Sequence, residues 1–296
     1  MPFAVRLLCR HAVGDAGMIG VMTISSPGPA CGEIPYAVLE AFGVEPGSVS
    51  RSVGEARVYD GVVLKPVTHT DEAEWCANVF EALEVPDLRL PRPLRAHNGA
   101  AVVMGWCGWE HVAGQPAPER WLDVLAVADR LHRSLAGYAR PGWMGTKDDP
   151  WRQADRYAWD EAALATHLLT HRLHPLLQPL EKLRTPDPPR SQVVHLDLLG
   201  NVLFTGGAAA PAIIDPTFYW RPAGYSAAIV AVDAAAWTAA GVAPLEHVAD
   251  GDDLHLVVRA ARFRIARDVL NPAAGADEFT AHAKVVDWIL EHVAHG

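Results

Sequence analysis

Three polar residues stand where short strands are expected to end, and their chemical types suit phosphoryl transfer. Asp197 follows the strand-like stretch 192–195, and Asn201 comes four residues later. Asp215 ends the next strand-like stretch, 212–215. The ends of a hairpin meet at one edge, so we expect these side chains to converge. Carboxylate and amide oxygens suit Mg²⁺, and a carboxylate beside a metal can orient and deprotonate a hydroxyl.

The elements that must position these residues change in character along the chain. The first part alternates short apolar runs with turn residues, and one helix interrupts it. From Pro118 onward the apolar spacing is mostly helical. Helices are expected at 35–42, 70–83, 119–136, 151–169, 223–240, 252–270 and 277–294, and strands at 48–53, 56–59, 62–67, 100–104, 192–195 and 212–215.

This pattern predicts an α+β fold with two lobes. We expect a small β-rich N-lobe over 33–107 and a larger α-helical C-lobe over 108–296, with a hinge around 105–114. Residues 1–32 read as a weakly ordered leader rather than a secretion signal, because Gly and Asp interrupt the apolar run that a signal peptide needs.

Composition narrows the class of protein. The 296 residues carry a formal net charge of −10, so bulk attraction to nucleic acid or to an anionic membrane is not expected. The 4 cysteines have no CxxC spacing, which suits a reducing cytoplasm better than a disulfide framework or a zinc ribbon. The longest apolar stretch, 225–241, contains Asp233 and reads as a buried helix rather than a membrane span.

The residues around the polar cluster resemble the aminoglycoside phosphotransferase and choline kinase superfamily, which has a bilobal protein-kinase-like fold. The matching phrases are 195–204 and 214–222, and they are particularly similar to a group of uncharacterised actinobacterial members. The resemblance extends from about residue 34 to 268. It implies that Asp197 is the catalytic base and that His195 braces the loop. It also implies that Asn201 and Asp215 hold Mg²⁺.

Four further residues match the superfamily more loosely. Lys65 lies on the third expected strand, where the superfamily has a lysine that contacts the phosphates of ATP. Glu74 lies on the next helix, with the spacing of that lysine's ion-pair partner. Met104 and Trp106 fall where a hinge would present backbone groups to adenine.

Three departures from the superfamily leave other functions open. Most relatives have five residues from the base to the metal-binding Asn, whereas Asp197 and Asn201 are four apart. Leu196 replaces a usual glycine, and between 48 and 59 only Gly54 is available for a phosphate-binding loop.

The first hypothesis is an ATP- and Mg²⁺-dependent phosphotransferase acting on a hydroxyl of a small molecule such as an aminoglycoside. The second is a kinase-like binding or scaffold protein without catalysis. A third is a kinase-like enzyme that phosphorylates Ser or Thr of a biosynthetic peptide.

A histidine pattern outside the motif has a separate interpretation. His167, His171 and His174 have the spacing of one helical face, and imidazole is a common zinc ligand. No carboxylate or cysteine lies nearby to complete a metal site, and Pro175 ends the helix. We therefore expect a solvated or substrate-facing polar stripe, with zinc binding as the alternative.

Overall fold

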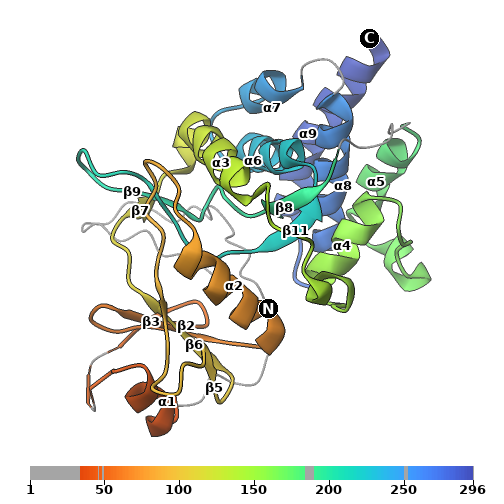
Figure 1. Cartoon of the computed structure of the whole chain (residues 1–296). Helices are drawn as coiled ribbons and strands as arrows, with labels where there is room; N and C mark the ends of the chain where they lie inside the picture. The colour runs from red at the N-terminus through yellow and green to blue at the C-terminus, as the bar shows by residue number, and fades with distance from the viewer. Residues whose placement is uncertain (1–33, 46, 49, 184–189, 250–252, 296) are drawn as a thin grey trace, which may run out of the picture. The chain divides into compact units, whose positions relative to one another are not determined.

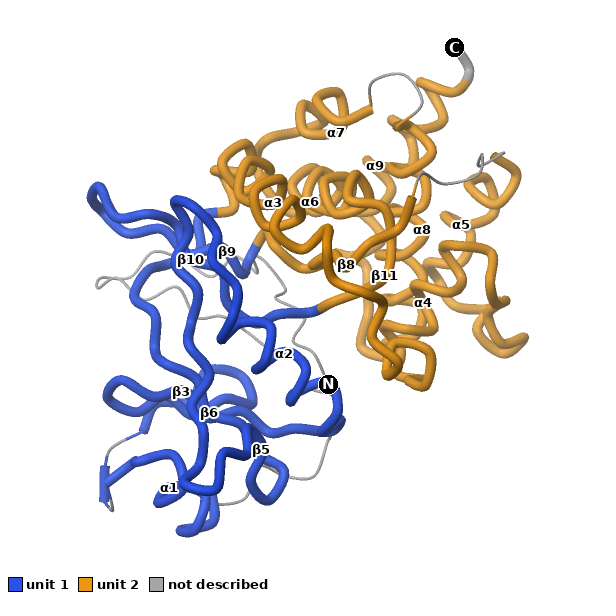
Figure 2. The backbone as a smooth tube through the Cα atoms, in the orientation of Figure 1, with its two compact units in different colours: residues 1–117, 200–217 blue, residues 118–199, 218–296 orange. Residues whose placement is uncertain are grey.

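The structure is a computed structural model of the whole chain, and it describes residues 34–45, 47–48, 50–183, 190–249 and 253–295. The expected leader, 1–32, lies outside these residues. The chain forms two compact units, coloured separately in Figure 2. Unit 1 comprises 1–117 and 200–217, and unit 2 comprises 118–199 and 218–296. These units differ from the expected lobes because the segment 200–217 packs with unit 1.

Unit 1 is built on an antiparallel sheet in the order β1-β2-β3-β6-β4, with β5 also paired to β6. The register of β3 and β6 places Lys65 opposite Cys107 and Leu64 opposite Gly108. The strands are β1 (Arg51–Val53), β2 (Ala56–Val58), β3 (Val62–Pro66), β4 (Pro93–Leu94), β5 (Val102–Val103) and β6 (Trp106–Glu110).

A helix packs on each face of this sheet. On one face, α1 (Tyr36–Ala41) and the following Phe42 pack against Leu64. Gly108 permits this contact, because a Cβ at that position would lie 2.7 Å from the Phe42 ring. Successive strand residues face opposite sides, so Trp109 lies on the other face. There its ring meets Phe80 of α2 (Thr70–Ala82) edge to face, with centroids 5.6 Å apart.

A second, three-stranded sheet in unit 1 has the order β10-β9-β7. Its strands are β7 (Gln115–Pro116), β9 (Val202–Phe204) and β10 (Ala212–Ile213). In the β9–β10 hairpin, Ile213 is the register partner of Val202. Asn201 and Ile214 are the next residues outward, so both lie at the same end of the hairpin.

Unit 2 is helical and is centred on α6 (Ala223–Trp237), most of which is buried. Helices α3, α7, α8 and α9 all contact α6 (Figure 1). The other helices are α3 (Trp121–Leu135), α4 (Pro150–Ala158), α5 (His174–Glu181), α7 (Ala243–Val248), α8 (Leu254–Val269) and α9 (Ala276–His295), with 3₁₀ turns at Pro118–Arg120, Gly142–Gly145 and Thr166–Thr170.

One antiparallel pair of strands completes unit 2. These are β8 (Gln192–His195) and β11 (Phe218–Arg221). His195 is the register partner of Phe218 at one end of the pair, and Gln192 is the partner of Arg221 at the other. The chain therefore leaves β8 at the end where His195 pairs with Phe218. Residues 195–197, which carry the expected catalytic groups, lie at this end.

Two expectations about helices need correction. The helix expected over 151–169 ends at Ala158, and a separate 3₁₀ turn covers Thr166–Thr170. His167 lies in that turn and His174 begins α5, so the three histidines do not share one helix. Among the described residues, no group of three or more His, Cys, Asp or Glu side chains is placed to hold a metal ion. Nor does any described helix combine the length and apolarity that crossing a bilayer requires.

Candidate active site

An ion pair in unit 1 joins two of the expected site residues. Lys65 on β3 and Asp215 just beyond β10 are 150 residues apart in the chain, and Nζ lies 2.7 Å from Oδ1. The two side chains are 20% and 16% exposed. Partial burial weakens the screening of this pair by water, so it is stronger than a surface ion pair. The structure therefore brings together an amine and a carboxylate that the sequence placed on separate elements.

The backbone around Asp215 fixes where its carboxylate lies. Asp215 has φ 53°, in the left-handed region that residues other than glycine rarely adopt. The Thr217 hydroxyl donates to the Asp215 carbonyl at 3.2 Å. The neighbouring Ile214 N–H donates to the Asn201 carbonyl at 2.9 Å. Asn201 is buried, and these contacts hold it at the same hairpin end as Asp215.

Asp197 belongs to unit 2, where Arg264 of α8 contacts it. Arg264 Nη2 lies 3.1 Å from Asp197 Oδ1 and also donates to the Leu196 carbonyl at 3.3 Å. The Arg264 Nε donates to Asp233 of α6 at 2.8 Å. Burial favours the neutral form of Asp233 and raises its pKa, although Arg264 acts in the opposite direction. Arg264 thus holds the Asp197 carboxylate in place, and Asp233 holds Arg264 in place.

His195 connects the same loop to two other helices of unit 2. Its Nδ1 accepts the Asp197 backbone N–H at 3.1 Å, which leaves the ring proton on Nε2. Its backbone N–H donates to Nε2 of His132 on α3 at 3.1 Å. Its carbonyl accepts the Ser226 hydroxyl of α6 at 2.6 Å. These contacts connect the loop at His195 to α3 and α6.

His132 accepts that hydrogen bond because it is neutral. Burial, together with the nearby His195, lowers the pKa of His132 to about 3. A protonated His132 would place a second donor against the His195 N–H, which explains why the neutral ring is the stable form here.

Glu74, another expected nucleotide-binding residue, has different partners from the one expected. Glu74 on α2 contacts Arg95, with Oε2 3.4 Å from Nη1, and its Oε1 accepts the Ala101 N–H at 3.1 Å. The expected ion pair between Glu74 and Lys65 is therefore replaced by two pairs, Glu74–Arg95 and Lys65–Asp215. The cause is Arg95, whose guanidinium also reaches Asn78 and Glu81 along the same side of α2.

Met104 and Trp106 belong to a tight turn and a strand rather than to a hinge. Val103 of β5 pairs with Trp106 of β6, so Met104 and Gly105 form the two-residue loop between them. Both loop residues have positive φ, 49° and 78°, as the favoured two-residue hairpin turn requires. Met104 is 68% exposed. The expected hinge over 105–114 instead contains β6, which lies inside the sheet.

The β1–β2 hairpin is equally tight. Val53 pairs with Ala56, which leaves Gly54 and Glu55 as a two-residue turn. Gly54 has φ 58°, so glycine suits the backbone there. A turn of this length places a carboxylate, not a run of backbone N–H groups, at the tip of the hairpin.

The expected residues are divided between the two units. Lys65, Asn201 and Asp215 belong to unit 1, whereas His195 and Asp197 belong to unit 2. The chain passes from unit 2 to unit 1 after Leu199, inside the Asp197–Asn201 motif.

Arg264 and Asp233 were not predicted as part of the site. The sequence held one usable signal for them. Asp233 is the single charged residue of a stretch that otherwise looks buried, and a buried carboxylate needs a cationic partner.

The sequence matches no family model, and no curated protein matches it either. Solved structures do match it. An aminoglycoside phosphotransferase from Alicyclobacillus acidocaldarius has 15% identity and a TM-score of 0.54, over 92% of this chain and 98% of that one. Aminoglycoside phosphotransferase APH(4)-Ia, in a ternary complex with AMP-PNP and hygromycin B, has 16% identity and a TM-score of 0.56, over 88% and 98% of the two chains.

The chain has the aminoglycoside phosphotransferase fold. A choline/ethanolamine kinase family protein from Mesorhizobium loti shares it, with 14% identity and a TM-score of 0.51 over 86% of this chain and 94% of that one. This confirms the expected α+β, protein-kinase-like fold, in which Lys65 lies on an antiparallel sheet and Asp197 on a loop of the helical part.

Proposed function

We propose that the protein is an ATP- and Mg²⁺-dependent phosphotransferase that moves the γ-phosphoryl group of ATP to a hydroxyl of a small molecule. The observation that carries this proposal is the 2.7 Å contact between Lys65 and Asp215. Structural neighbours support it, because one was solved with AMP-PNP and hygromycin B and another, amicoumacin kinase hAmiN, with AMP-PNP, Ca²⁺ and Ami.

Asp215 and Asn201 fit a divalent cation. They offer a carboxylate and an amide oxygen, which are hard ligands, from one end of the β9–β10 hairpin. When bound there, Mg²⁺ supplies neutralisation of the charge on the phosphate oxygens. Asp215 would hold the cation together with Asn201, and the Lys65 ammonium would be placed to contact a phosphate oxygen. The Lys65–Asp215 pair therefore suits a ligand such as MgATP, which carries both a cation and anionic phosphates.

Asp197 has the role of orienting the acceptor hydroxyl and taking its proton at a carboxylate oxygen. A carboxylate is a weak base, and Arg264 holds this one in place through an ion pair of 3.1 Å. Phosphoryl transfer tolerates a weak base, since its loose transition state needs positioning and charge stabilisation more than early proton removal. His195 holds the Asp197 backbone during this step.

Two buried free thiols, Cys76 and Cys107, support a reducing compartment such as the cytoplasm. We infer a small molecule as the acceptor from the small-molecule kinases among the structural neighbours. The acidic composition supports neither nucleic acid nor membrane as a partner.

One observation favours a second function. The tight Gly54-Glu55 turn lacks the several glycine N–H groups that usually cradle phosphates. A kinase-like protein that binds a partner without transferring phosphate would need no such loop. This alternative predicts that ATP does not bind.

Calorimetry with MgATP separates the two functions. We expect the wild-type protein to bind MgATP, and Lys65→Met and Asp215→Asn each to weaken binding at least about tenfold, since each removes a charge-assisted contact. Lys182→Met, at an exposed position at the end of α5, is the matched control and should bind normally. No binding by the wild type at millimolar MgATP would favour the binding protein. Transfer of labelled phosphate to a panel of aminoglycosides and other polyols would then identify the acceptor.

A further inference from the structure

His282 of α9 makes a buried hydrogen bond to Asp268 of α8. Its Nε2 lies 2.8 Å from Asp268 Oδ2, and the His282 side chain is 2% exposed. Burial alone would raise the pKa of Asp268, but His282 and the neighbouring Arg267 lower it below its ordinary value. Asp268 is therefore an ionised acceptor, and the Nε2–H group of His282 donates to it.

The same histidine contacts α6 through its ring. The rings of His282 and Trp237 meet edge to face, with centroids 5.8 Å apart. The other ring nitrogen, Nδ1, is buried and has no hydrogen-bond partner among the described residues. His282 thus joins α8 through one ring nitrogen and α6 through the face and edge of its ring.

Both contacts lie one helical turn from the Arg264–Asp233 pair. Asp268 follows Arg264 by four residues on α8, and Trp237 follows Asp233 by four residues on α6. Residues four apart lie on the same face of a helix. The ion pair and the two contacts of the histidine therefore occupy adjacent turns where α6 and α8 meet.

The charges of these groups act on one another. Burial raises the pKa of Asp233, and Arg264 lowers it. His282 also lowers the pKa of Asp233, whereas Asp268 raises it. Charges in a folded protein have such effects on groups that lie close to them. His282 and Asp268 are therefore neighbours of the ion pair itself.

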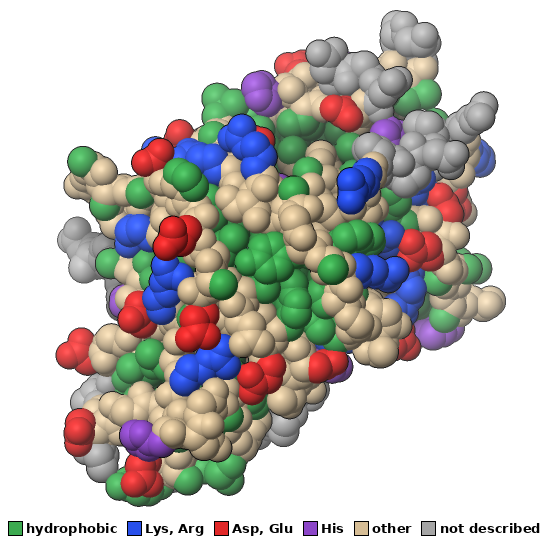
Figure 3. Space-filling model, in the orientation of Figure 1, with side chains coloured by type: hydrophobic (Ala, Val, Ile, Leu, Met, Phe, Trp, Pro, Cys, Tyr) green, Lys and Arg blue, Asp and Glu red, His purple; other side chains and the backbone are tan. Residues whose placement is uncertain are grey.

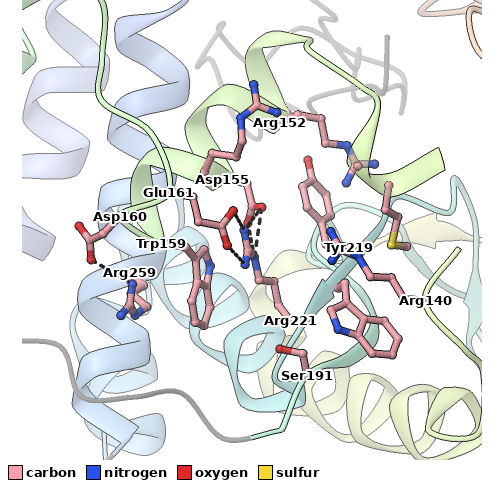
Figure 4. Close-up of a pocket in the computed structure, with 14 residues that line it drawn as sticks. Arg140, Arg152, Asp155, Trp159, Asp160, Glu161, Ser191, Tyr219, Arg221 and Arg259 are labelled. Carbon is pink, nitrogen blue, oxygen red and sulfur yellow. Dashed lines mark hydrogen bonds and ion pairs between the residues drawn. The ribbon is translucent and has the colours of Figure 1, made fainter. Parts of the chain in front are cut away.

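Helix α8 is fixed by α4 on the other side of Arg264. Arg259 and Arg262 donate to the last two backbone carbonyls of α4, each at 3.0 Å. Arg259 also contacts Asp160 at the edge of a pocket of about 630 Å³ in unit 2 (Figure 4). Figure 3 shows Lys and Arg side chains beside Asp and Glu side chains over the part of unit 2 where Figure 1 shows α4. The turn that carries Arg264 thus lies between a segment of α8 held by α4 and the residue held by α9, Asp268.

We propose that His282 is a positioning residue for Asp197. His282 joins α8 to α6 beside the Arg264–Asp233 pair, and so fixes where the Arg264 guanidinium lies. Arg264 in turn holds the Asp197 carboxylate. The inference rests on the proposed function, because it concerns the residue to which proton transfer is assigned.

Two substitutions separate the contacts of His282. His282→Phe keeps a ring beside Trp237 and removes the donor to Asp268, whereas His282→Gln keeps a donor. The rate measured is the release of labelled phosphate from MgATP to water, which requires no knowledge of the natural acceptor. We expect His282→Phe to lower kcat about 10- to 100-fold and to change KM for MgATP less than about twofold, because misplacement of a reacting group is costly and the nucleotide is assigned to unit 1. His282→Gln should keep kcat within about threefold of the wild type.

Lys284→Met is the matched control on the same helix. Lys284 is exposed, and it also joins α9 to α6, by donating to the Ala235 and Ala236 carbonyls at 3.3 Å and 3.2 Å. Its partners are backbone carbonyls at the end of α6 rather than the charged groups, so its loss should leave kcat unchanged. If the role of His282 were only structural, His282→Phe and Lys284→Met would behave alike at temperatures where both are folded.

A double-mutant cycle on Arg264→Met and Asp233→Asn gives a readout that needs no nucleotide. Urea unfolding measures the coupling free energy of this pair, and we expect His282→Phe to reduce it by at least about half, whereas Lys284→Met should not. An unchanged coupling free energy would overturn the proposal, as would a kcat for His282→Phe equal to that of the wild type. Because the cycle is independent of MgATP, it decides on His282 even if the wild type binds no nucleotide and the proposed function fails.

Discussion

Arg264 on α8 lies 3.1 Å from Asp197, the residue to which we assign proton transfer. An arginine at this distance holds the carboxylate in place, and a second carboxylate, Asp233, holds the arginine. The position of Asp197 thus depends on two helices that are distant from it in sequence.

Asp197→Asn should reduce phosphoryl transfer by about 10²- to 10⁴-fold, the usual contribution of a general base. The amide keeps the shape of the side chain, and Arg264 keeps its contact with Asp233. We therefore expect MgATP affinity and the melting temperature to change little. Steady-state kinetics and calorimetry on the same preparation measure both effects, and a fully active variant would remove Asp197 from the mechanism.

Breaking the buried Arg264–Asp233 pair should be costly. Arg264→Met leaves Asp233 without its cation, and loss of one partner of a buried pair typically costs about 3–5 kcal/mol. Urea unfolding measures this free energy. The control is Arg133→Met, which breaks an exposed pair with Asp129, where the expected loss is below about 1 kcal/mol. Equal losses in the two variants would contradict the buried role of Arg264.

The protein should become less stable as the pH is lowered, because of His132. Its folded-state pKa of about 3 lies below the ordinary value of 6.5. Between these values the unfolded chain binds a proton that the folded protein does not, so acidification favours unfolding by up to about 1.4 kcal/mol per pH unit. His132→Gln keeps an acceptor for the His195 N–H and removes this titration. Urea unfolding from pH 7 to pH 5 should therefore show a shallower pH dependence in the variant, and identical slopes would refute the assignment.

Gly108→Ala should destabilise unit 1. The new methyl group would lie 2.7 Å from the Phe42 ring, and overpacking of this kind typically costs about 1–3 kcal/mol. Gly137→Ala is the matched control, because nothing lies within 4 Å of a Cβ there. Adding Phe42→Leu should recover part of the loss in Gly108→Ala. If the two alanine variants melt at the same temperature, Phe42 does not pack as described.

Several elements were predictable because one local pattern dominated them. The strand 192–195 matches β8, and the Ala-rich stretch at 223–240 forms the buried α6. In both cases, neighbouring residues in the sequence carried the information. The hairpin expected between 192–195 and 212–215 does not form, because β8 pairs with β11 and β10 pairs with β9, so Asn201 and Asp215 share the end of a different hairpin.

Other features depended on contacts that local patterns do not encode. Arg264 lies 67 residues from Asp197, and nothing in α8 distinguishes it from the arginines around it. Arg95 competes for Glu74 from beyond the helix, which spacing from Lys65 alone could not reveal. The resemblance placed Met104 and Trp106 at a hinge, and the turn at Met104-Gly105 was missed because two-residue turns usually begin with Asn, Asp or Gly rather than a large apolar residue.

The path of the chain between the two units limits how the protein can be divided. A polypeptide that stops at Ala117 would carry β7 without its partner β9, and Lys65 without Asp215. A polypeptide that begins at Pro118 would still contain residues 200–217, but their strands β9 and β10 would lack β7, the third strand of the sheet. Neither half is obtained by a single cut, so limited proteolysis near residue 117 should yield fragments that stay associated until they are denatured.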